Sequence, residues 1–178
     1  MKFDAHKLVQ LARPSYFDGQ LLTADDFRAE QNFVREKFWL HNRMLHGYGI
    51  VAGLDVAVQE NENGEVNVVI APGYALDGYG RELIVPEALP IAVARDRHDF
   101  VVFLKYAETD DPHSLVPTMN DGMQATRILE TVQVLFEPPA ERTTSPTQRD
   151  DFAIPIARLR KPSHQWQHDR NFRPPRAK

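Results

Sequence analysis

The apolar positions between residues 23 and 46 recur with the spacing of an α-helix. Thr23, Asp25 and Asp26 resemble a capping box, in which a hydroxyl and carboxylates satisfy the free amides of a helix start. Neither glycine nor proline interrupts the chain from Thr23 to Leu45, and Gly47 then suits a helix exit through a left-handed residue. The pattern predicts one long helix over about residues 23–46.

The apolar residues of this helix form two stripes. One stripe contains Phe27, Val34, Phe38 and Leu45, and the other contains Phe33, Leu40 and Met44 beside Trp39. Two aromatic-rich stripes are more than one sheet face usually covers. Either the helix is deeply buried in its own domain, or one stripe packs against another subunit. The candidates for the packed or intersubunit face are Phe33, Trp39, Leu40 and Met44.

After Gly47 the period changes from 3.6 to 2, which is typical of strands. The residues between Glu60 and Glu65 include Asn63-Gly64, the strongest short hairpin signal. The most hydrophobic strand, 100–107, is expected at the centre of its sheet, and 91–94 at an edge because prolines bracket it. Residues 108–122 read as a polar loop. The expected strands are 50–58, 66–70, 74–76, 82–85, 91–94, 100–107, 127–136 and 152–159.

These elements predict a mainly β fold: an antiparallel sandwich or barrel with one long N-terminal helix and an extended C-terminal arm. Residues 1–160 would form the helix-plus-sandwich domain. Residues 161–178 would form the arm, because Pro162, Pro174 and Pro175 prevent regular structure there. Removing the arm is then expected to leave the domain folded and to weaken assembly.

Composition narrows the function classes. The 178 residues are 42% hydrophobic and 26% charged, which is typical of a globular chain, and they include no cysteine. A disulfide scaffold, a thiol nucleophile and a thiolate zinc site are therefore excluded. The start of the chain has no apolar run like that of a secretory signal, and nothing is long enough to span a membrane. Synthesis in the cytoplasm without a signal peptide is the expectation.

Charge is unevenly distributed along the chain. The net charge is −4, but residues 158–178 hold seven Lys or Arg and one acid, which leaves +6 there and −10 elsewhere. A basic arm on an acidic body favours docking on a neighbouring protein over binding nucleic acid. The arm's candidate contact residues are Trp166, Arg170, Arg173 and Arg176.

Catalytic and metal-binding motifs do not emerge from the sequence. There is no nucleophile elbow and no phosphate loop, and no pair of carboxylates stands out. His164 and His168 are four residues apart, but they lie beside a proline with no third ligand nearby in the sequence. We therefore expect no enzyme, no cofactor and no metal. A carbohydrate- or surface-binding module remains the alternative, with Tyr48, Tyr74, Tyr79 and Tyr106 as candidates for stacking on sugars.

Several segments, taken in order, resemble a known family. They are RPSYFDGQLLTADDF at 13–27, HNRMLHG at 41–47, GIVAGLDV at 49–56, APGYALD at 71–77 and GRELIVP at 80–86. This order is similar to that of small baseplate-associated proteins of contractile injection systems and phage-like tails. It more distantly resembles the N-terminal shoulder domain of the type VI secretion baseplate protein TssK and of phage receptor-binding proteins.

The resemblance implies a structural role in a baseplate or tail-fibre assembly, within a phage-like particle or injection apparatus. Other baseplate or tail subunits would be its partners, and a homo-oligomer, a trimer as in the relatives, would form. The segment around Tyr16, Phe17 and Leu21 would anchor the entry to the helix.

Overall fold

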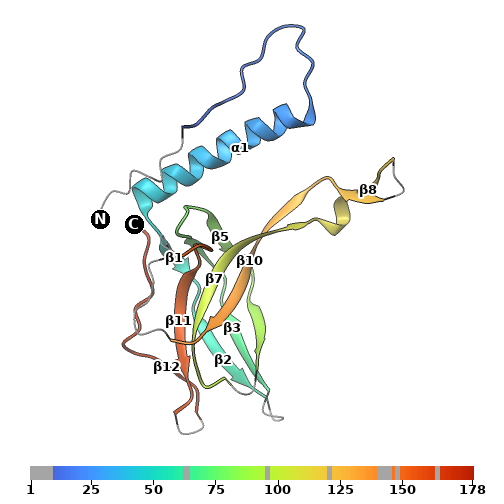
Figure 1. The fold of residues 1–178 in the computed structure, drawn as a ribbon. Helices are drawn as coiled ribbons and strands as arrows, with labels where there is room; N and C mark the ends of the chain where they lie inside the picture. The colour runs from blue at the N-terminus through green and yellow to red at the C-terminus, as the bar shows by residue number, and fades with distance from the viewer. Residues whose placement is uncertain are drawn as a thin grey trace.

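The computed structural model describes residues 10–61, 65–94, 97–119, 122–139, 146, 149–162 and 165–178. The Asn63-Gly64 turn and His164 lie outside these residues. The fold is mainly β, with a sandwich-like arrangement of open antiparallel sheets below a single long helix (Figure 1). The predicted fold class is confirmed, and of the two β architectures it is the sandwich that forms.

The predicted helix is confirmed at both ends. Helix α1 spans Ala24–His41 and continues directly into a π-helical turn, η2, at Asn42–His46. Thr23 donates to Asp26 Oδ2 from its backbone nitrogen at 2.8 Å and from its hydroxyl at 2.7 Å. These hydrogen bonds lower the pKa of Asp26. The chain then leaves the helix through Gly47, whose φ is 76°.

Three sheets build the body of the molecule. One has the strand order β1-β4-β5, the second β2-β3-β6 and the third β10-β7-β11-β12. The central position expected for β7 and the edge position expected for β6 are both confirmed. The bounds are β1 Gly49–Gly53, β2 Val56–Glu60, β3 Val66–Ile70, β4 Gly73–Leu76, β5 Glu82–Val85, β6 Leu89–Val93, β7 Asp99–Asp110, β10 Ile128–Glu137, β11 Ile154–Arg160 and β12 Gln167–His168.

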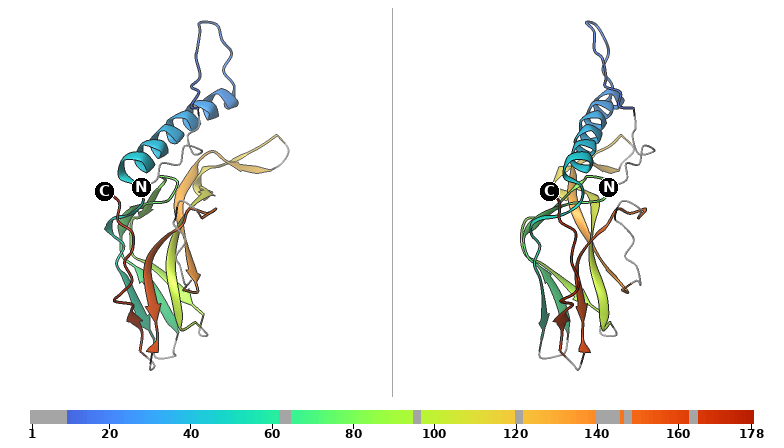
Figure 2. Two further views of the ribbon diagram at one scale, coloured as in Figure 1. Left: turned by 60° about the vertical axis from the view of Figure 1, so that its left-hand side comes forward. Right: turned by 90° about the vertical axis from the view of Figure 1, so that its left-hand side faces the viewer.

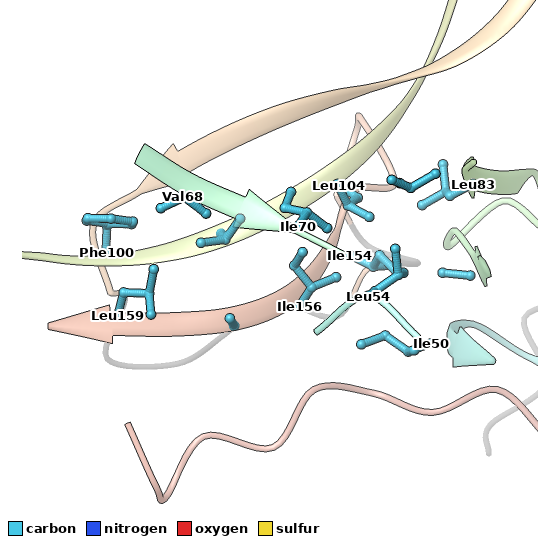
Figure 3. Packing of buried hydrophobic residues seen from close by; sticks show 14 of the residues in the cluster. Ile50, Leu54, Val68, Ile70, Leu83, Phe100, Leu104, Ile154, Ile156 and Leu159 are labelled. Carbon is cyan, nitrogen blue, oxygen red and sulfur yellow. The ribbon is translucent and has the colours of Figure 1, made fainter. Parts of the chain in front are cut away.

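The core lies between these sheets. Figure 3 shows Val68 and Ile70 of β3 facing Phe100 and Leu104 of β7, with residues of β11 alongside. The alternation of β3 explains its orientation, since Val66, Val68 and Ile70 are buried whereas the residues between them are partly exposed. The core belongs to the sandwich, and no residue of α1 is buried in it. The prediction that the helix is deeply buried in its own domain is therefore wrong.

The stretch expected to be a polar loop is instead a structured hairpin. Strand β7 runs on to Asp110, and η3 (Pro112–Ser114), β8 (Leu115–Pro117) and β9 (Met123–Ala125) follow before β10 begins. Residues of β7 are mostly buried up to Tyr106 and exposed from Glu108 onward. The outer parts of β7 and β10, together with β8 and β9, therefore project from the sandwich into solvent. Because β8 and β9 face no core, no apolar alternation predicts them.

The C-terminal segment is extended, as the prolines predict, and it lies along the sandwich (Figure 2). Strand β12 pairs with β11, and the amide of Ile50 donates to the carbonyl of Pro175 at 2.9 Å. Gly49 makes this approach possible, because a Cβ there would stand 2.5 Å from the backbone of Pro175.

Candidate protein–protein interface

The turn between β4 and β5 forms the surface on which the C-terminal end of the helix packs. Asp77, whose side chain is fully buried, accepts the amides of Tyr79, Gly80 and Arg81 at 2.9 Å each. Its other oxygen lies 2.6 Å from the Arg81 Nε. Burial raises the pKa of Asp77, and the Arg81 charge and the amide donors oppose that shift. The network fixes a turn whose two carbonyls, at positions 79 and 80, point to the helix.

The end of the helix docks on these carbonyls. Asn42 donates to the carbonyl of Gly80 at 3.0 Å, and Arg43 donates to that of Tyr79 at 2.9 Å. Trp39 packs edge-on against Tyr79 and Tyr106, with centroid distances of 5.6 and 6.2 Å. These contacts come from the last turns of the helix, so its N-terminal half extends beyond the sandwich (Figure 1).

One stripe of the helix is uncovered. Phe38 is 61% exposed, and the other members of its stripe, Phe27, Val34 and Leu45, are each at least half exposed. Exposed apolar side chains along one face of a helix are a candidate interaction surface. The stripe was visible in the sequence, but the choice between the two stripes required knowing which side of the helix meets the sandwich.

A groove follows this stripe. A hollow of about 450 Å³ is lined by Phe27, Glu30, Gln31, Val34 and Arg35. A second hollow of about 150 Å³ shares Val34 and Arg35 and is also lined by Phe38, Trp39, Asn42, Glu82 and Glu130. We call the two together the helix groove. Its lining combines apolar side chains of the helix with carboxylates, two of which come from β5 and β10.

A second exposed apolar surface lies on the projecting hairpin, which we call the hairpin arm (residues 111–119 and 122–129). Met119 is fully exposed and Met123 is 61% exposed. Leu115, Val116, Ile128 and Leu129 are exposed as well. The prediction of a polar loop over residues 108–122 missed Leu115, Val116 and Met119, because β8 and β9 pair with each other rather than with the core.

The predicted entry segment is exposed too. Tyr16, Phe17 and Leu21 lie in the loop that reaches past the N-terminal end of α1 (Figure 1). Tyr16 donates to Glu30 Oε2 at 3.1 Å, which ties the loop to the helix. Desolvation, and then this hydrogen bond to a carboxylate, raise the pKa of the tyrosine. This segment therefore extends the exposed surface of the helix.

The four predicted helix residues separate in the structure. Trp39 is half-buried and faces the sandwich, where Arg35 stacks on its ring at 5.1 Å. Phe33 and Leu40 are half-buried, and Met44 is exposed. Trp39 is thus engaged within its own chain, while the uncovered stripe consists of Phe27, Val34, Phe38 and Leu45, which are not among the predicted interface residues.

The predicted arm residues also separate. Trp166 packs edge-on against Phe100 at 5.5 Å and belongs with the core. Arg170, Arg173 and Arg176 have exposed side chains, although the Arg173 guanidinium donates to the carbonyls of residues 170 and 172. The acid of this segment, Asp169, forms ion pairs with Arg158 at 3.2 Å and Arg160 at 3.5 Å. Part of the basic charge is therefore neutralised within the chain.

The tyrosines considered for sugar stacking, Tyr48 included, interact with other groups of the chain. Tyr106 is buried, Tyr79 contacts Trp39, and Tyr74 donates to Glu82 at 2.7 Å. Burial and the neighbouring carboxylates raise the pKa of Tyr74 and Tyr106. Within the described part of the chain, no three His, Asp or Glu side chains gather as a metal site would require. No helix there is long and apolar enough to cross a membrane.

The candidate interface therefore consists of exposed surfaces on a β-sandwich that carries one long helix. No protein-family model matches the sequence, and no curated protein matches it. Solved structures do match. A chain of the type VI secretion system TssK-TssF-TssG baseplate subcomplex aligns with a TM-score of 0.56 at 14% identity, over 94% of this chain and 62% of that one.

Two further solved structures give the same result. The crystal structure of TssK aligns with a TM-score of 0.54 at 11% identity, over 90% of this chain and 41% of TssK. A chain of the baseplate complex from the type VI secretion system aligns with a TM-score of 0.55 at 14% identity, over 94% and 60%. The resemblance to TssK is confirmed at the level of the fold, and this chain spans between two fifths and about three fifths of the chains it matches.

Proposed function

We propose that this chain is a structural component of a baseplate or tail-fibre type in a contractile injection system or phage-like tail. The observation that carries the proposal is the fold, which is shared over at least 90% of this chain with proteins of the type VI baseplate. The uncovered helix stripe and the projecting hairpin arm support it, because they are surfaces without a partner in the described chain.

The protein would act by forming a homo-oligomer, a trimer in the simplest case, and by docking other baseplate or tail subunits. A structural role, without catalysis, accounts for the exposed features. Exposed apolar stripes on a rigid helix are typical of assembly surfaces. The exposed arginines of the C-terminal segment, Arg170, Arg173 and Arg176, would contact acidic surfaces of neighbouring subunits.

Two measurements test this proposal. Light scattering on the purified protein at increasing concentration should show a species heavier than the monomer, and a monomer throughout would contradict self-assembly. In the source cells, an epitope-tagged copy should co-sediment with tail-like particles identified by electron microscopy. A tagged copy found only in the particle-free fraction would contradict the assembly role.

A further inference from the structure

We propose that the hairpin arm of one copy docks in the helix groove of the next copy. The inference rests on the self-assembly proposed above and specifies its contact. Both surfaces are apolar, both are exposed, and they lie on different parts of the same chain. Such a contact is heterologous, so it closes into a ring or continues as an open chain according to the rotation between copies.

The arm is held in one shape before it meets a partner. Its bend at η3 is built on Asp111 and Ser114, both buried. The Asp111 carboxylate accepts the amide of His113 at 2.9 Å, and the Ser114 hydroxyl donates to the carbonyl of Asp111 at 2.9 Å. On the returning strand, the amide of Arg127 donates to the Ser114 hydroxyl oxygen at 3.0 Å. A preorganised arm loses little conformational entropy when it docks.

The arm does not reach its own groove. None of the residues that line the groove belongs to the hairpin arm, and the left view of Figure 2 shows α1 and the arm leaving the sandwich as two separate elements. The root of the hairpin meets the helix, where Glu108 pairs with Arg35 at 3.1 Å and Glu130 lines the groove. The arm that fills a groove therefore comes from a second copy.

Charge also matches the arm to the groove. The groove lining carries three carboxylates, Glu30, Glu82 and Glu130, against one cation, Arg35, which is already paired with Glu108. The hairpin arm has one carboxylate, Asp111, which is buried and accepts the amide of His113, and one Lys or Arg, the exposed Arg127. The exposed charge of the arm is therefore a cation, which fits a groove lined by carboxylates.

Mixing two variants that each lack one surface tests this contact. The arm variant is Met119→Glu with Met123→Glu, and the groove variant is Val34→Glu with Phe38→Glu. All four side chains are at least half exposed, so both proteins should keep the melting temperature that the wild type has at concentrations low enough for it to be monomeric. Each variant alone should lose the heavier species in light scattering. Their equimolar mixture should form a species of twice the monomer mass, because one intact arm and one intact groove remain.

The alternatives have distinct outcomes. If the arm variant assembles like the wild type while the groove variant does not, the helices pack on each other and the inference is overturned. A mixture that stays monomeric overturns it as well. In both cases the wild-type oligomer, and with it the proposed function, would stand. If the double arm substitution lowers the melting temperature, Met119→Glu alone repeats the test at a fully exposed side chain.

Discussion

At the scale of single residues, Gly80 determines whether the helix can pack against the sandwich. Its φ is 99°, and a Cβ there would stand 2.1 Å from the carbonyl oxygen of Trp39. The turn at 77–80 is already one reason for a glycine at position 80, because glycine adopts a positive φ without strain. The close approach of a helix some forty positions earlier in the chain is a second reason, and it belongs to the tertiary structure.

Replacing Gly80 with alanine should cost about 3 kcal/mol or more, because backbone strain and the clash with the helix add up. Gly19→Ala is the matched control: its φ is 85°, but nothing lies within 4 Å of the added methyl group. This control should cost only about 1 kcal/mol. Urea denaturation of both variants measures the difference, and equal losses would show that the helix moves aside freely.

At the scale of elements, the helix was predictable, and its surroundings were not. Thr23, the unbroken stretch to Leu45 and Gly47 set its bounds, because capping and termination are local effects. Which stripe is covered depends on the turn after β4, which is distant in the sequence. The hairpin arm shows the converse: β8 and β9 pair with each other outside the core, so the apolar alternation that reveals other strands is missing.

Two neighbouring aromatic residues of α1 should therefore respond differently to substitution. Trp39→Ala should lower the free energy of unfolding by about 2 kcal/mol, since it removes the half-buried ring between Tyr79 and Tyr106. Phe38→Ala, one position earlier and largely exposed, should change it by less than about 0.5 kcal/mol. Thermal and urea unfolding at a concentration where light scattering shows the monomer provide the measurement. Comparable losses in the two variants would mean that Phe38 is packed within its own chain.

At the scale of the whole molecule, the C-terminal segment packs along the sandwich. Trp166 packs on Phe100, Phe172 packs against Val101 and Phe103, and the backbone of Pro175 pairs with Ile50. A segment with these contacts contributes to stability, whatever its exposed arginines bind. The structure thus leads to the opposite expectation from the one that proline content and charge suggested.

Ending the chain after Arg160 should lower the free energy of unfolding by about 3 kcal/mol or more, through lost aromatic packing and backbone pairing. Trp166→Ala alone should cost about 2 kcal/mol. Arg170→Ala, at an exposed side chain of the same segment, is the control and should be nearly neutral. If the truncated protein melts like the full chain, the segment is a detachable arm after all.

The sequence by itself determined the helix, the long strands and the mainly β class, because capping, period and turn chemistry are properties of neighbouring residues. The order of motifs such as 13–27 and 80–86 also indicated the TssK-like fold that the solved structures match. The tertiary structure alone decided which helix stripe is uncovered, that residues 111–119 and 122–129 project, and that the C-terminal segment lies on the sandwich. Burial and exposure are set by contacts between distant residues, such as Trp39 with Tyr106 and Gly49 with Pro175, and no local pattern encodes them.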